Sequence, residues 1–367
     1  MKSKYPPLYY AEYLKLDKLL DCQTPKSTEY LDKLAHDEVL FIIVHQVYEL
    51  WFKQILHELD SVVAIFKDGF VNENNMGIAV ARIARINEIQ KLLIDQLRVM
   101  ETMTQLDFLE FRDLLVPASG FQSYQFRLIE NKLGLRHEQR QNFDKNAYVS
   151  RLSPEHQQIV AEAEAQPCLF DLVECWLERT PFLKVDGFDF WESYRIAVQK
   201  ALDRDKEILR RNPLLSEQEK LKEIEAHSHT EAGFLAIFDE QKHRELVKKG
   251  ERRLSYAGTQ AALLINLFRD EPILHTPFRF LTVLIEVDEL FTAWRHRHAL
   301  MVHRMIGTKV GTGGSSGHEY LHLTAERHKV FSDLTNLSNY LIPRSELPKL
   351  PREFQKNLGF YYTYKDK

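Results

Sequence analysis

Histidine is the residue type whose placement in this chain most directly suggests chemistry, and fifteen histidines occur among its 367 residues. With about 100° of rotation per residue in a helix, His298 lies in one apolar stripe with Phe291 and Met305. His296 and His303 fall on the opposite side of that helix, with the arginines. A histidine on an apolar face is either a core residue bonded to a backbone carbonyl or an axial ligand of haem. The stripe alone leaves both interpretations open.

A second histidine lies in a similar setting on another long helical stretch. His45 recurs at helical spacing with Phe41, Tyr48 and Phe52, so it lies among aromatic side chains. Alone it would be an ordinary core residue. Because two such histidines lie on two long helices, the pair favours a cofactor between them.

A third element combines an arginine with aromatic residues. Phe108 and Arg112 are one helical turn apart and share a face. The arginine either extends along the surface to reach water or forms a bidentate fork for a ligand carboxylate. Pro117 ends the helix, and Ser119 is a candidate N-cap of the next one.

The fourth element is a glycine-rich loop, residues 307–317, directly after the helix that carries His298. It lacks a Gly-Lys-Ser/Thr ending and the dinucleotide-binding glycine spacing, so it is not a phosphate-binding loop of the usual kinds. It is either a flexible linker or a lid over a polar group of a substrate.

Two other chemistries are weaker. The pairs Glu240/His243 and Glu319/His322 match the Glu-x-x-His motif of di-iron bundles, but about one match is expected by chance, and residues 239–245 are polar all round. A hydrolase is not supported, because no Gly-x-Ser-x-Gly elbow occurs. The cysteines Cys22, Cys168 and Cys175 are too scattered for a disulfide framework or a zinc site.

Long helices must position these residues. Only 14 glycines and 13 prolines occur in the chain, which disfavours many short strands joined by tight turns. Apolar residues recur at three- and four-residue spacing over 39–66, 78–103 and 280–306, and the last stretch ends at Gly307. We therefore expect an all-α fold, with a large helical domain and a lateral helical insertion.

The composition of the chain suggests where this domain is interrupted. Residues from about 136 to 250 are rich in Gln, Glu, Lys and Arg and lack dense apolar stripes. We expect a main domain formed by residues 1–140 and 250–350, an insertion at 141–249, and a tail at 351–367.

Charge and hydropathy exclude several classes of partner. The formal net charge is −4 and the pI is about 6.4, which is unlike a nucleic-acid-binding domain. No run of 18 apolar residues predicts a membrane span. The N-terminus does not resemble a secretory signal, so we expect a cytoplasmic protein.

Together, the four elements resemble the tryptophan 2,3-dioxygenase family. The resemblance runs from about residue 8 to about 350, and its motifs occur in the family's order. The motifs that carry it are Tyr10–Leu20, His36–Gln46 with Glu49–Lys53, Phe111–Ser123 (FRDLLVPASGFQS), Gly250–Tyr256, Trp294–His298 (WRHRH) and Val302–Gly317. The family opens the indole ring of L-tryptophan with O₂ to give N-formyl-L-kynurenine, the first step of the kynurenine pathway.

The resemblance also implies roles for individual residues. His298 would be the proximal ligand of haem b, with Trp294, Ser119 and Gly120 beside the haem. His45 would lie on the distal side near the indole N–H, as a positioning partner more than as an essential base. The implied substrate contacts are Arg112 and Thr312 for the polar end of tryptophan, Phe41 and Phe108 for the indole, and Tyr10 and Tyr13, at least partly from a neighbouring subunit of a homotetramer (a dimer of dimers).

Three alternatives remain at this stage: a relative that oxygenates another indole, a haem protein that only binds gas, and a helical scaffold without a cofactor.

Overall fold

The computed structural model of the chain describes residues 5–136, 140, 149–181, 183–185, 187–307, 309, 324–325, 327–351, 355–356 and 358–359. These residues are mainly helical. The helices are α1 (Tyr10–Leu14), α2 (Leu16–Leu19), α3 (Lys26–Tyr30), α4 (His36–Lys67), α5 (Glu73–Met100), α6 (Gln105–Phe111), η1 (Arg112–Leu115), η2 (Gly120–Gln122), α7 (Tyr124–Leu133), α8 (Pro154–Glu164), α9 (Leu169–Glu178), α10 (Phe190–Arg211), α11 (Glu217–Phe238), α12 (Glu240–Lys248), α13 (Tyr256–Leu267), α14 (Pro272–Ile306), α16 (Ser332–Asn336), η4 (Leu337–Tyr340) and η5 (Arg344–Glu346).

A short antiparallel hairpin precedes α10. Its strands are β1 (Lys184–Val185) and β2 (Phe188–Asp189), with Lys184 opposite Asp189. The expected all-α class is confirmed.

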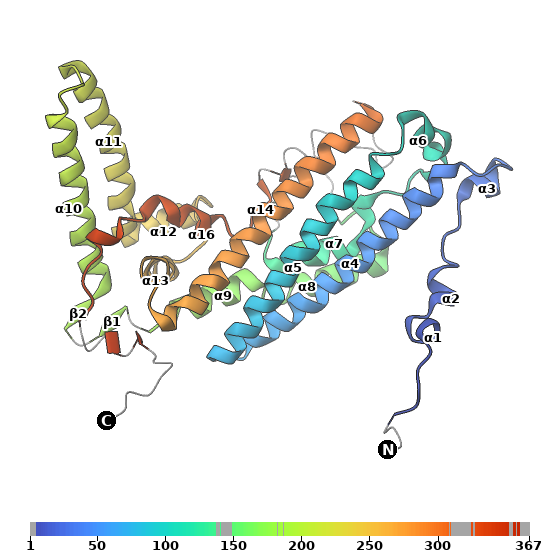
Figure 1. Ribbon diagram of the computed structural model, residues 1–367, viewed down its shortest axis with the longest axis horizontal. Helices are drawn as coiled ribbons and strands as arrows, with labels where there is room; N and C mark the ends of the chain where they lie inside the picture. Colours follow the sequence, from blue (N-terminus) through green and yellow to red (C-terminus); the bar gives the residue numbers. More distant parts are fainter. Residues whose placement is uncertain are drawn as a thin grey trace.

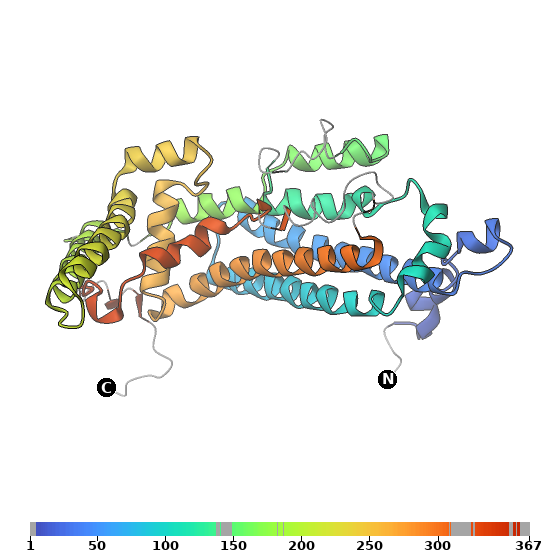
Figure 2. The same cartoon turned by 90° about the horizontal axis from the view of Figure 1, so that it is seen from above.

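Three long helices form the core of the molecule. α4, α5 and α14 run side by side in both views (Figures 1 and 2), and α5 packs along its length against both α4 and α14. The apolar stripes predicted from the sequence face inward: Ile55 and Leu59 of α4, Ile83 of α5 and Leu284 of α14 are all fully buried. Burial of these stripes is the main source of the stability of the bundle.

The ends of these helices differ from the predicted ones because end signals lie outside the apolar stripes. α5 begins at Glu73, where the side chain of Asn72 accepts a bond from the Asn75 amide. α14 begins at Pro272 and continues through Pro277. Pro277 has no N–H to donate, so α14 lacks one backbone hydrogen bond there; the helix nevertheless begins before the apolar stretch predicted from residue 280. The predicted end at Gly307 is confirmed, with φ +63°.

The polar central part of the chain is helical, as expected. α10 and α11 form an antiparallel pair that extends away from the three-helix core (Figure 1). α9 instead packs against α4 and α13, and its Leu169 and Leu177 are fully buried in the same core. The division at 141–249 stays a prediction.

By length and composition, α4 could cross a membrane. Such helices also occur in the cores of proteins that are not in membranes, and here Val44, Phe52 and Val62 of α4 belong to the buried core.

Candidate functional site

A single cavity brings together most of the residues singled out in the sequence. It is lined by side chains of α4, α6, α7 and α14 and of the segment from Arg112 to Ser123. Its empty space is about 1650 Å³, part of which is open to solvent. His45 and His298 both line this cavity, from α4 and α14 respectively. The two helices therefore present their histidines to one space, as predicted.

His298 is a neutral imidazole at this cavity. Its Nδ1 is buried and has no hydrogen-bond partner among the described residues. Burial, and secondarily the nearby His45, lowers the pKa of His298 to about 4 because the charged form loses its hydration. The ring of Trp294, one turn earlier on α14, stacks on the imidazole at 5.2 Å and 22°. An uncharged imidazole in an apolar cavity has a lone pair available to a metal ion.

His45 is neutral as well, but one of its nitrogens is held. Its Nδ1 lies 2.7 Å from the carbonyl oxygen of Phe41. A carbonyl only accepts, so Nδ1 carries the proton and Nε2 keeps a lone pair. His45 is exposed at the cavity, yet the surrounding protein still removes part of its hydration and lowers its pKa, and the Phe41 carbonyl and the Glu49 carboxylate partly offset that effect. His45 is therefore a hydrogen-bond acceptor for a ligand N–H.

Aromatic rings form a slot next to His45. The Phe41 ring lies 4.1 Å from the imidazole and stacks with Phe108 at 5.8 Å. Phe111 meets both phenylalanines edge-on, at 5.6 Å and 5.5 Å. Such a slot accepts a flat aromatic ligand by stacking and edge contacts.

Arg112 supplies a cation to the same cavity. It is the first residue of η1 and lines the cavity, with 17% of its side chain exposed and its Nη1 3.4 Å from Asp113. Ser119 and Gly120 line the same cavity. The hydroxyl of Ser119 caps η2 and the side chain of Gln122 returns a bond to its amide, which confirms Ser119 as an N-cap.

Three predicted substrate contacts are not brought to the cavity by the described part of one chain. Thr312 and the rest of the glycine loop beyond Lys309 lie outside the described residues. Tyr10 and Tyr13 are on α1, where they are 70% and 69% exposed, and they do not line this chain's cavity. Their predicted contribution to a neighbouring subunit stays a prediction.

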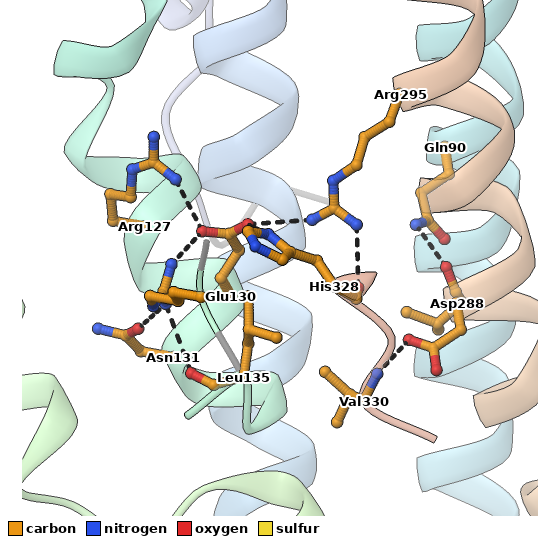
Figure 3. Close-up of polar contacts among 11 residues, drawn as sticks. Gln90, Arg127, Glu130, Asn131, Leu135, Asp288, Arg295, His328 and Val330 are labelled. Atoms are coloured by element: carbon orange, nitrogen blue, oxygen red, sulfur yellow. Dashed lines mark hydrogen bonds and ion pairs between the residues drawn. The ribbon is translucent and has the colours of Figure 1, made fainter. Parts of the chain in front are cut away.

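Sequence reasoning missed a buried cluster of charges at the cavity wall. The carboxylate of Glu130 on α7 accepts from Arg127 at 2.9 Å, Arg140 at 2.6 Å and Arg295 at 3.0 Å, and His328 Nδ1 lies 3.6 Å away. Figure 3 shows Arg127 and Arg295 converging on this carboxylate from α7 and α14.

Burial alone would raise the pKa of Glu130, but Arg140, Arg127, His328 and Arg295 hold it well below its ordinary value. The carboxylate therefore stays charged and ties α7 to α14. One partial signal was present in the sequence, the three-residue spacing of Arg127 and Glu130. The helical-face interpretation placed the arginines near His298 on the outer side of the helix, which was wrong for Arg295, because this residue is buried.

The di-iron alternative has no support among the described residues, where no group of three potential metal ligands occurs. Both nitrogens of His243 are already engaged: Nε2 lies 2.8 Å from the Leu254 carbonyl and Nδ1 lies 3.1 Å from Arg252. Glu319 and His322 lie outside the described residues.

Known proteins similar to this chain belong to the same family that the sequence motifs resemble. A family model described as Tryptophan 2,3-dioxygenase matches residues 2–341. The chain is 53% identical to a "Tryptophan 2,3-dioxygenase" of Bdellovibrio bacteriovorus over 98% of this chain and 100% of that relative. It is 48% identical to a protein of the same name from Dictyostelium discoideum, over 99% of this chain and 90% of the relative. The one from Mus musculus is 47% identical, over 97% of this chain and 87% of the relative.

Proposed function

The chain belongs to the tryptophan 2,3-dioxygenase family, and from this membership we propose which of its residues bind the cofactor and the substrate. It is an oxidoreductase that uses O₂ to open the indole ring of tryptophan, giving N-formylkynurenine. The observation that carries the assignment of residues is the single cavity onto which His45, His298, the Phe41–Phe108 slot and Arg112 all converge.

The described residues fit haem b, with His298 as its proximal ligand. The imidazole of His298 is neutral, its Nδ1 is buried without a partner among the described residues, and it lines an otherwise largely apolar cavity. Trp294, Ser119 and Gly120 line the same space and would contact the haem. When bound, ferrous haem supplies the oxygen-activating chemistry.

The protein's own contribution is to hold tryptophan in one orientation. Phe41 and Phe108 form a wall of the indole pocket, and the lone pair on Nε2 of His45 accepts the indole N–H. Arg112 pairs with the substrate carboxylate. Two fixed ends leave the indole little rotational freedom, which is how positioning accelerates a reaction. His45 acts here as a hydrogen-bond partner, and no acid–base pair of side chains is required.

The remaining assignments follow from family membership. Thr312 binds the polar end of tryptophan, and Tyr10 and Tyr13 complete the pocket of a neighbouring subunit in a homotetramer. The large exposed fractions of both tyrosines agree with a role between subunits. We place the enzyme in the cytoplasm.

One experiment tests the whole assignment. The haem-loaded, reduced protein is incubated with L-tryptophan and O₂, and the products are separated. N-formylkynurenine is the expected product. If a fully loaded protein consumes another indole instead, the enzyme is a relative with a different substrate; if it only binds O₂, it is a gas-binding haem protein.

A further inference from the structure

The orientation of the His298 ring has an unusual origin. A histidine that binds a metal ion commonly donates its other N–H to a carbonyl or carboxylate, and this bond fixes the ring. The Nδ1 of His298 is buried and has no such acceptor among the described residues. Among the described residues, a ring contact holds the imidazole instead.

The neighbouring contact is the indole ring of Trp294. It stacks on His298 with 5.2 Å between ring centroids and 22° between planes. Phe126 packs against Trp294 at 5.4 Å. The indole of Trp294 can restrict the rotation of the imidazole only if the indole is itself held in place.

Tyr48 fixes that ring. The Nε1–H of Trp294 donates to the Tyr48 hydroxyl at 3.3 Å, and this hydroxyl donates to the Leu93 carbonyl at 2.5 Å. Tyr48 is 9% exposed and lines the cavity. The chain of contacts thus runs from the backbone of α5 through Tyr48 of α4 to two residues of α14.

We propose that Tyr48 is a positioning residue for the proximal histidine: through its bond to Trp294, it sets the orientation of the His298 ring. The inference rests on the proposed role of His298. Burial raises the pKa of Tyr48 to about 12, so its hydroxyl keeps its proton and continues to donate to Leu93. Removing the hydroxyl leaves Trp294 without its acceptor and frees the ring that stacks on His298.

The test compares Y48F with a matched control, Y194F, in the haem-loaded full chain. Tyr194 is also buried and donates its hydroxyl to a backbone carbonyl, that of Tyr340, but it does not line the cavity. Two properties are measured: the iron–histidine stretching band of the reduced protein by resonance Raman, and the rate of haem transfer to an acceptor protein. We expect Y48F to shift or broaden the band and to release haem about three- to tenfold faster, the effect of one buried hydrogen bond. Y194F should leave both properties unchanged.

The variant W294F separates this route from a general loosening of the site. It keeps an aromatic ring but has no N–H, so Y48F should add nothing further in the W294F background. Additive effects of the two substitutions would overturn the inference. If Y48F does not fold, W294F alone must still show the shifted band, and an unchanged band in W294F would likewise overturn it.

The proposed function is tested separately with H298A. If H298A loses haem while Y48F has the band and the haem-release rate of the unaltered chain, the role of Tyr48 is wrong and the role of His298 stands. If H298A retains haem with an unchanged band, both are wrong.

Discussion

The two walls of the cavity present the same residue type in different ways. On the α4 wall, His45 has its Nδ1 bound to the Phe41 carbonyl one turn earlier in its own helix. On the α14 wall, the Nδ1 of His298 has no partner among the described residues and the ring is held by stacking on Trp294. Both imidazoles are neutral because burial lowers their pKa values.

This difference shows how histidine can act as a hydrogen-bond acceptor in one wall and as a metal ligand in the other. A fixed Nδ1–H leaves His45 with one defined acceptor, Nε2, which suits recognition of a ligand N–H. His298 is neutral because its pKa is lowered, so one ring nitrogen keeps a lone pair that suits a metal ligand, while its buried Nδ1 has no partner among the described residues. The α14 wall is also tied to α7 by the charges around Glu130, whereas the His45 bond is local to α4.

The largest expected effect comes from removing the ligand of the α14 wall. His298→Ala should abolish retention of haem, measured by the haem absorbance that remains with the protein after gel filtration. His296→Ala and His303→Ala should retain haem, because neither residue lines the cavity. Equal loss in all three variants would show that the two walls do not differ in the way described.

The face of the helix on which His298 lies could be predicted from the sequence alone. The stripes over α4, α5 and α14 are long and regular, so the core and the cavity position of His45 and His298 followed from periodicity. The Glu130 cluster could not be predicted, because Arg295 and His328 are distant from Glu130 in sequence and only packing brings them together. The start of α14 was missed because this helix continues through Pro277, which lies inside it, where a proline usually ends or kinks a helix.

A second prediction concerns what supports the α14 wall. Glu130→Gln leaves the buried Arg127, Arg140 and Arg295 without the carboxylate between them, so the free energy of unfolding should fall by about 3–5 kcal/mol. Urea unfolding followed by circular dichroism measures this change. The control is Glu192→Gln, which removes an exposed ion pair with Arg195 and should leave the free energy of unfolding nearly unchanged, because water screens such a pair. A similar fall in the free energy of unfolding for the two variants would mean that the ion pairs of Glu130 stabilise the fold no more than an exposed pair does.

The third prediction acts on the substrate side of the cavity. Arg112→Leu should weaken tryptophan binding by about 2–5 kcal/mol, the cost of losing a charged contact with a carboxylate. Haem content should not change, because the α14 wall is intact. Titration of the haem spectrum with L-tryptophan measures the affinity. Tryptamine, which lacks the carboxylate, provides the control: its affinity should be the same for both proteins.

The smallest expected effect is on the pH dependence of the free energy of unfolding, which compares His298 with His45 in the cofactor-free protein. Since the pKa of His298 is about 4 in the folded chain and about 6.5 in an unfolded one, the unfolded state binds more protons between these values. The free energy of unfolding must then rise with pH over this window, and His298→Leu should flatten that rise. His45→Leu should flatten it less, because the Phe41 carbonyl and Glu49 offset the effect of burial on His45 and no such group offsets it for His298. Urea unfolding at several pH values between 4 and 7 measures how steeply the free energy of unfolding rises with pH in each variant. Equal flattening by the two substitutions would mean that the two imidazoles have equally lowered pKa values, and that the local bond to Phe41 does not distinguish them.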